Sequence, residues 1–180
     1  MLAQFKSLRS SLETVKNMSS TERLGAAYNF LTERTAKKSI REDYYQYSSL
    51  IAEYFCTLSN FGLFGVGLYY RDEATLFAAT MSALSHAIPS QRLHDLDMLG
   101  VVAIAAKVCN NYQVLLDDPK TVAWGAGALS INFIDTNITR RHLDKVGPWI
   151  HVVWHLAAAL ALYQFNVAQN EIMERPLHRM

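Results

Sequence analysis

The sequence predicts an all-α protein, an integral-membrane bundle of about five core helices that follows an amphipathic N-terminal helical segment. Apolar residues make up 51% of the 180 residues and charged residues only 18%, whereas about a quarter of a typical soluble domain is charged. The apolar residues gather in long runs that lack the alternation of strands and exceed strand length. Five such runs cover roughly residues 47–70, 74–89, 97–116, 121–138 and 148–167.

The first forty residues differ in character from the rest of the chain. They are polar and helix-prone, and Ser20, Thr21 and Glu22 predict the start of an amphipathic helix that ends near Lys38. Such a segment can lie along a membrane surface or pack as a polar cap. We therefore expect an N-terminal segment over residues 1–40, the helical bundle over 41–168 and a C-terminal tail over 169–180.

The length of the runs favours a membrane bundle. A membrane-spanning helix needs about 20 mostly apolar residues, and the runs at 47–70, 97–116 and 148–167 reach that length. Lys107, Asn132 and Asp135 interrupt the runs, and a charge at the centre of a bilayer costs about 2.5–3.5 kcal/mol, so these residues should face the bundle interior or lie near a helix end. The mean hydropathy of +0.03 keeps a soluble bundle with unusually apolar helices as the alternative.

Helix direction groups the polar residues of the runs at one end of the bundle. If five helices alternate in direction, the starts of the first, third and fifth helices and the end of the second share one side. The polar residues at or near those ends are Glu53, Ser82, His86, Asp97, His151 and His155. The same side carries 12 of the 17 Lys and Arg, so the positive-inside rule predicts that the N-terminus and this end are cytoplasmic, in an organelle that the sequence does not indicate.

Two further features of the composition limit the function. A net charge of +1 argues against a nucleic-acid binder, which usually has a large basic excess. Cys56 and Cys109 both lie in apolar runs and indicate little about the redox compartment. We expect His94, His142 and His178 to be solvated residues of loops or the tail.

His86, His151 and His155, together with Ser82 and Asp97, form a candidate metal site. Ser82 and His86 are one helical turn apart, and so are His151 and His155, so each pair shares a helix face. Asp97 follows eleven residues after His86, beyond a predicted turn that would bring the next helix alongside. Histidines and a carboxylate in apolar surroundings are costly to bury unless a ligand engages them.

Zinc suits these side chains. It binds neutral imidazole nitrogens and, in catalytic sites, keeps one position open for water, whose pKa falls to about 7. Asp97 could accept the proton or orient the water, and Ser82 could donate a hydrogen bond to the developing oxyanion. Two histidines four residues apart are only moderately specific, and core histidines stacked on Trp149 and Trp154 are the structural alternative.

Four motifs occur in a fixed order over residues 40–167. They are Ile51-Ala52-Glu53-Tyr54-Phe55 with Leu58-Ser59-Asn60, Ser82-x-x-x-His86, Leu96-Asp97 and His151-Val-Val-Trp-His155-Leu. In this order they resemble the alkaline ceramidase family, within the CREST superfamily of membrane hydrolases. The resemblance implies a zinc ion held by His86, His151 and His155, with Ser82 and Asp97 beside it or acting in catalysis. It also implies hydrolysis of an amide bond in a ceramide-like lipid substrate.

The chain departs from that family in its length. Alkaline ceramidases resemble a seven-helix bundle, whereas about 53 residues between Asp97 and His151 leave room for one intervening helix. Removing two helices preserves the direction of the last one, so the site can still close. The substrate cavity would then be smaller, or a partner subunit of a homo-oligomer would complete it.

The family also has a calcium site before and within its first helix. Glu42 and Glu53 match two of its ligands, but Ser39 and Tyr44 replace an acidic residue and an Asn, and Ile40 replaces a Trp. Calcium prefers six to eight oxygen ligands, so the resemblance leaves Ca²⁺ as a second candidate metal. The alternative is that Glu42 belongs to a helix-capping or solvated acidic pair.

The sequence therefore predicts a zinc-dependent lipid hydrolase that cleaves an amide bond by means of metal-activated water. Three alternatives stay open. They are an ester-cleaving phospholipase-type member, a receptor-like or scaffolding member that keeps a structural zinc, and a soluble helical metal-binding protein.

Overall fold

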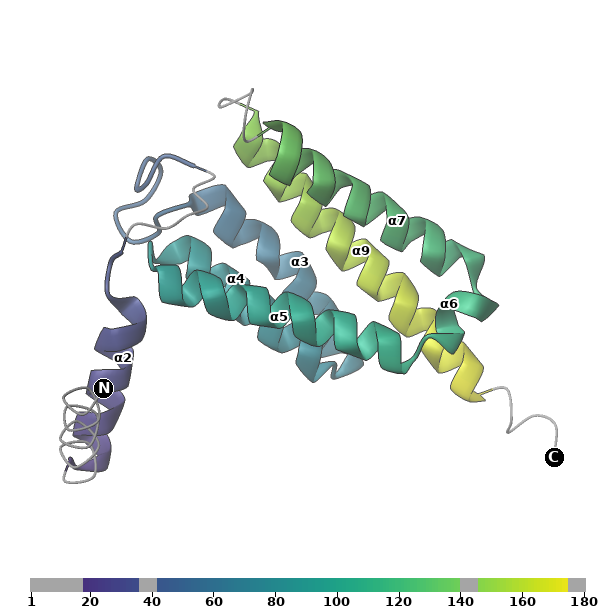
Figure 1. The fold of residues 1–180 in the computed structure, drawn as a ribbon, viewed down its shortest axis with the longest axis horizontal. Helices are drawn as coiled ribbons and strands as arrows, with labels where there is room; N and C mark the ends of the chain where they lie inside the picture. Colours follow the sequence, from purple (N-terminus) through teal and green to yellow (C-terminus); the bar gives the residue numbers. More distant parts are fainter. Residues whose placement is uncertain (1–17, 36–41, 140–145, 175–180) are drawn as a thin grey trace, which may run out of the picture. The chain divides into compact units, whose positions relative to one another are not determined.

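Every regular element that the structure describes is a helix, as the sequence predicts. The computed structural model describes residues 18–35, 42–139 and 146–174. Its elements are α2 (Ser20–Thr32), α3 (Tyr54–Tyr70), α4 (Glu73–Ala87), α5 (Gln91–Asn110), α6 (Gln113–Asp117), α7 (Pro119–Ile134), the π-helical turn η1 (Asp135–Thr139) and α9 (Gly147–Glu174) (Figure 1). The five predicted apolar runs correspond to α3, α4, α5, α7 and α9. Residues 169–174 of the predicted tail are helical, because α9 continues to Glu174.

Residues up to Glu33 form one compact unit and the chain from Arg34 onward forms another. In the first unit, α2 begins with a capping box, in which the Ser19 hydroxyl accepts a bond from the Glu22 amide and the Glu22 carboxylate accepts one from the Ser19 amide. The cap therefore lies one residue before the predicted start. The helix ends at Thr32, earlier than the predicted end near Lys38, and none of its residues is buried.

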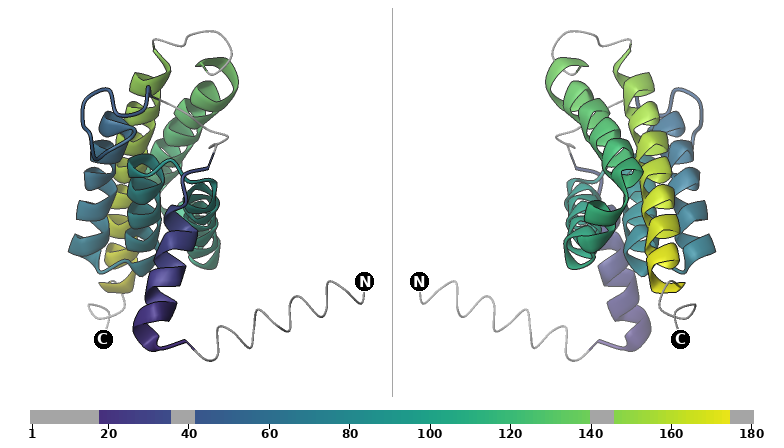
Figure 2. Two further views of the ribbon diagram at one scale, coloured as in Figure 1. Left: turned by 90° about the vertical axis from the view of Figure 1, so that its left-hand side faces the viewer. Right: turned by 90° about the vertical axis from the view of Figure 1, so that its right-hand side faces the viewer.

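In the second unit, helices that are distant in sequence pack side by side. α3 contacts α4 and α4 contacts α5, while α9 contacts both α3 and α7, and Figures 1 and 2 show α9 running alongside both of these helices. The short helix α6 joins α5 to α7 and packs against α9. This arrangement gathers the starts of α3, α5 and α9 and the ends of α4 and α7 at one end of the bundle.

Close approach between α4 and α5 depends on a glycine. A Cβ atom added to Gly100 of α5 would lie 2.7 Å from the Ala78 Cα of α4, a distance that Cβ atoms do not tolerate. Ala78 and Gly100 are both buried. Small residues at this crossing therefore allow the two backbones to approach closely, as they do between helices packed in membranes.

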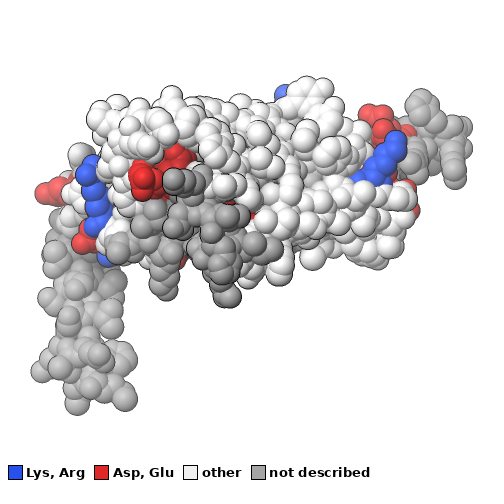
Figure 3. Space-filling view, turned by 90° about the horizontal axis from the view of Figure 1, so that it is seen from above, with Lys and Arg blue, Asp and Glu red and all other residues white. Residues whose placement is uncertain are grey.

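The interior of the bundle holds many polar side chains in addition to its apolar clusters. Among the described residues, the largest side chains that are completely buried include Glu53, Asn60, Thr75 and Asp135. Many large apolar side chains lie on the outside, such as Phe61, which is 69% exposed. On the face seen in Figure 3, most of the bundle surface carries no charged side chain.

One helix within the described residues is both long and apolar enough to cross a membrane. It covers Pro148–Glu174, and its most apolar window has a mean hydropathy of 1.3. The helices α3, α4 and α7, with 17, 15 and 16 residues, are close to or below the lower limit of about 17 residues for a span.

Lys107 faces the bundle interior, as its position in an apolar run requires. Its ammonium group donates hydrogen bonds to the Asp72 carboxylate and, over 2.6 Å, to the Asn166 side-chain oxygen. Asp72 also accepts bonds from the amide and hydroxyl of Thr75 and so caps α4. This network links α4, α5 and α9 at the end of the bundle opposite the histidines.

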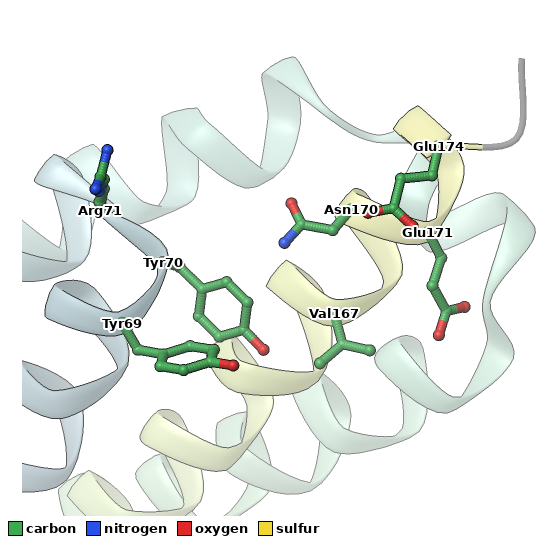
Figure 4. A pocket seen from close by; sticks show the side chains of 7 residues that line it. All are labelled: Tyr69, Tyr70, Arg71, Val167, Asn170, Glu171 and Glu174. Carbon is green, nitrogen blue, oxygen red and sulfur yellow. The ribbon is translucent and has the colours of Figure 1, made fainter. Parts of the chain in front are cut away.

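A surface cavity of about 440 Å³ lies where α3 and α9 end, and Tyr70, Arg71 and Glu171 are among the residues that line it (Figure 4). Tyr70 is 14 residues beyond Cys56 on α3, which corresponds to about 21 Å along the helix axis. The cavity therefore does not adjoin the histidines and says nothing about their chemistry.

Replacing Gly100 by alanine should destabilise the bundle by about 1–3 kcal/mol, because the new methyl group overpacks the α4–α5 crossing. The matched control is Gly127→Ala on α7, where an added Cβ meets nothing within 4 Å and the better helix propensity of alanine adds up to about 1 kcal/mol of stability. Thermal unfolding of both variants in detergent measures the difference. Equal midpoints for the two variants would contradict this close packing.

Candidate metal centre

The three histidines predicted as ligands lie together at one end of the bundle. His86 comes from the last turn of α4, and His151 and His155 come from the first three turns of α9. Their ring centroids are separated by 4.4 Å for His151 and His155, 4.9 Å for His86 and His151, and 5.4 Å for His86 and His155. All three side chains are buried. The geometry thus joins residues that are 65 positions apart in the sequence.

His86 is oriented by Glu53. The Glu53 Oε2 atom lies 2.6 Å from His86 Nδ1, and this carboxylate is completely buried. The main chains of the two residues are also joined, because the Glu53 amide donates to the His86 carbonyl over 2.9 Å and the Ala52 amide donates to the Ala87 carbonyl. The start of α3 is therefore fixed to the end of α4, and the His86 ring is fixed with it.

His151 is oriented in the same way by a different carboxylate. Asp135 begins the π-helical turn that follows α7, and its Oδ2 atom lies 2.9 Å from His151 Nδ1. Asp135 is also completely buried. The sequence reasoning treated it only as a polar interruption of an apolar run and missed its role. The sequence did contain a signal: Asp135 lies near the end of an apolar run, and the predicted helix directions bring that end to the histidines.

His155 has a hydroxyl as its partner. The Ser59 Oγ atom lies 2.6 Å from His155 Nδ1 and itself donates to the Cys56 carbonyl over 2.8 Å. Because the hydroxyl proton is directed to that carbonyl, Ser59 accepts the Nδ1–H of His155. The Asn60 amide nitrogen lies further from the same ring atom, at 3.4 Å. All three imidazoles thus have Nδ1 next to an oxygen, which assigns the lone pair to Nε2.

The Nε2 atoms of His86 and His151 lie only 3.1 Å apart. Two lone pairs at this distance repel each other unless a proton or a metal ion lies between the rings. Two ligands bonded to one tetrahedral zinc at about 2.0–2.1 Å are about 3.3 Å apart, close to the separation found here. A proton there would make one ring a buried imidazolium. The geometry therefore requires either a proton or a metal ion between the two Nε2 atoms.

The carboxylates behind the rings favour the metal. Glu53 and Asp135 are fully buried, and Glu42, also buried, lies next to Glu53. Burying negative charge is costly unless a positive charge compensates for it. A divalent cation between the imidazoles would supply that compensation, and carboxylates on the far nitrogens of metal-binding histidines are a common arrangement.

Cys56 also belongs to this cluster, although the sequence reasoning gave it no role. The possible ligand atoms of Cys56, His86 and His151 all lie within 4.8 Å of one another, and Cys56 is completely buried. His155 is close to both histidines by its ring centroid distances, but this compact set does not include it. The sequence did contain a signal for Cys56. It lies three residues after Glu53 and three before Ser59, at the start of α3.

Ser82 and Asp97 lie on facing sides of α4 and α5. The contact between Ala78 and Gly100 sets the register of this antiparallel pair, and moving one turn towards the histidines from that contact reaches Ser82 on one helix and Asp97 on the other. Both are buried. His86 lies one turn beyond Ser82. The register therefore places Ser82 and Asp97 further from this end of the bundle than the imidazoles.

His94 differs from its prediction as a solvated loop residue. It lies in α5 and is partly buried, with its Nδ1 atom 3.9 Å from Asp97 Oδ2. The error arose because α5 begins at Gln91, several residues before the apolar run. His142 and His178 lie outside the described residues.

Both predicted calcium ligands have protein partners. Glu42 accepts hydrogen bonds from the amides of Phe55 and Cys56 and so caps α3, while Glu53 holds His86. Burial and the nearby Glu53 carboxylate raise the pKa of Tyr44 to about 12, so its phenol is neutral at physiological pH. Calcium at Glu42 and Glu53 stays a prediction, and Ser39 and Ile40 lie outside the described residues.

The contacts of Trp149 do not favour the alternative in which the histidines only stack on tryptophans. Trp149 packs against Phe55 with ring centroids 5.0 Å apart, and the three imidazoles lie edge to face with one another.

Comparisons with models of known protein families, with characterised proteins and with solved structures found no match for this chain.

Weakening either carboxylate behind the rings should weaken metal binding without abolishing it. We expect Glu53→Gln and Asp135→Asn each to lower zinc affinity by about 10–100-fold, because each variant loses the charged partner that orients one imidazole. Competition with a coloured chelator measures the affinity. The control is Glu73→Gln, which changes an exposed glutamate of α4 at the opposite end of the bundle. Wild-type affinity in both site variants would contradict the assignment of these partners.

Proposed function

We propose that this protein is a zinc-dependent lipid hydrolase that cleaves an amide bond in a ceramide-like lipid. The observation that carries the proposal is the 3.1 Å separation of the His86 and His151 Nε2 atoms, with a buried carboxylate behind each ring. His155 lies beside them, with its Nδ1 atom held by Ser59. This is the donor set that the resemblance to alkaline ceramidases implies.

The donors fit zinc better than a harder metal. Imidazole nitrogens suit zinc, copper, iron and nickel, whereas magnesium and calcium require mostly oxygen ligands. When bound, zinc would polarise the substrate carbonyl and lower the pKa of a water to about 7. Glu53 and Asp135 would fix the orientation of their rings and increase the basicity of Nε2.

Two residues of the chain would then handle the proton and the oxyanion. Asp97 is a buried carboxylate on the face of α5 that is directed towards α4, so it can accept a proton from the attacking water and deliver it to the leaving amine. Ser82, opposite it, can donate a hydrogen bond to the oxygen on which negative charge develops. The register set by Ala78 and Gly100 supports this joint role.

A lipid substrate is favoured by the distribution of apolar residues. Leu129 and Phe133 of α7, at 67% and 62%, and Val102 of α5, at 60%, are among the exposed residues, while the interior holds buried carboxylates. Exposed apolar surface of this extent on a soluble monomer marks an interaction site. A membrane would cover it, and α9 is long and apolar enough to anchor the bundle there. The cytoplasmic orientation of the metal end stays a prediction from charge.

A scaffolding role with a structural zinc is the second candidate. Cys56, His86 and His151 form a compact set of possible ligands, and if His155 bound as well, four protein ligands would close the zinc site and leave no position for water.

Replacing Asp97 by asparagine separates these functions. A hydrolase should lose about 10²–10⁴-fold in kcat, because it loses its proton acceptor, while zinc content stays unchanged. The matched control is Asp95→Asn, an exposed residue of the same helix bonded to Gln91. Release of fatty acid from ceramides, and from ester lipids in parallel, measures turnover and resolves amide from ester cleavage. Zinc-loaded wild-type protein that hydrolyses none of these lipids would favour the scaffold instead.

A lysine on the outer surface tests the membrane environment. Leu129→Lys should destabilise the protein in lipid bilayers by about 2.5–3.5 kcal/mol if α7 faces lipid, whereas a solvated site usually changes stability by less than about 0.5 kcal/mol. Leu50→Lys is the control, since Leu50 is 84% exposed in the segment before α3. Unfolding in reconstituted vesicles measures both. Equal stability of the two variants, or a wild-type protein that stays monodisperse without detergent, would contradict the membrane assignment.

A further inference from the structure

Among the described residues beside the histidines, Cys56 is a possible ligand to which the proposed reaction gives no task. It lies in the first turn of α3, and its side chain is completely buried. A buried cysteine often serves only as a small apolar side chain. The apolar clusters of the described bundle, however, are built from other residues, including Leu63, Ala159, Leu162 and Phe165. Cys56 lies instead among imidazoles.

The distances place the sulfur within reach of a shared ion. Cys56 Sγ and one ring nitrogen each from His86 and His151 all lie within 4.8 Å of one another. A zinc–sulfur bond of about 2.3 Å and a zinc–nitrogen bond of about 2.0–2.1 Å put the sulfur and nitrogen ligands of a tetrahedral site about 3.6 Å apart. Small rotations of these side chains therefore bring all three atoms to one metal.

The backbone of Cys56 is fixed on both sides. Its amide donates to Glu42 Oε1 over 2.6 Å, and its carbonyl accepts from Ser59 Oγ over 2.8 Å and from Asn60 Nδ2 over 2.9 Å. The same Ser59 hydroxyl holds His155 Nδ1. One hydroxyl thus positions both Cys56 and His155, and such support is what orients ligands in metal sites.

We propose that Cys56 coordinates the metal through its thiolate together with His86 and His151, which makes the centre a mixed sulfur–nitrogen site with one position open to water. The inference rests on the metal site of the proposed function. On binding, the S–H bond of Cys56 breaks, a sulfur–metal bond forms and the proton is released to the solvent. A thiolate selects soft or borderline ions such as zinc, cobalt and cadmium over magnesium, calcium and manganese.

Cobalt substitution tests this directly in the full chain purified in detergent. Cobalt(II) bound to a thiolate has an intense sulfur-to-metal charge-transfer band in the near ultraviolet, whereas a centre of nitrogen and oxygen ligands lacks it. We expect the band in the wild-type protein and its loss in Cys56→Ser. Cys109→Ser, which changes the exposed cysteine, should keep the band.

X-ray absorption of the zinc-loaded wild-type protein gives a second readout that needs no variant. It should show a sulfur neighbour at about 2.3 Å in addition to nitrogen at about 2.0–2.1 Å. A centre that binds cobalt and zinc with nitrogen and oxygen neighbours alone would overturn the role of Cys56 and leave the proposed hydrolase intact. A wild-type protein that binds neither metal would overturn both. A charge-transfer band that persists in Cys56→Ser would also refute this ligand.

Discussion

The pairing of each imidazole Nδ1 atom with an oxygen from another element is the constraint on which the site depends. Glu53 precedes α3, Asp135 follows α7 and Ser59 lies within α3, and they engage His86, His151 and His155 in turn. These contacts assign the lone pairs to Nε2. They also tie α3 to α4 and to α9, and η1 to α9, at this end of the bundle. Fold and site are therefore stabilised by the same hydrogen bonds.

The buried polar groups and the exposed apolar residues follow from the same design. Glu53 and Asp135 at the metal end each face an imidazole, and the buried Asp72 at the other end faces Lys107. Small residues such as Ala78 and Gly100 let the helices approach, so few large side chains are needed in the core. Many bulky apolar residues lie on the outside. In a bilayer this arrangement is favourable, since lipid solvates them and the polar groups find partners inside.

The sequence predicted the helices and their direction well, because long apolar runs and short polar connections are local features. Direction alone was enough to bring His86, His151 and His155 to one end. The partners of these residues were harder to predict. Asp135 and Cys56 each look like incidental members of apolar runs, and their roles arise only when α7 and α3 pack beside α9 and α4. Helix ends were also less predictable: α9 continues to Glu174 and α2 begins after Ser19, since capping and packing decide these positions.

The zinc content of the wild-type protein, purified without added metal, tests the central claim most directly. Mass spectrometry of the metal in the native protein should find about one zinc per chain and almost none in His151→Ala, because this variant removes one of the two Nε2 atoms that lie 3.1 Å apart. A wild-type protein without zinc that cannot take it up, or an undiminished content in the variant, would contradict a shared metal and leave a proton between the two rings.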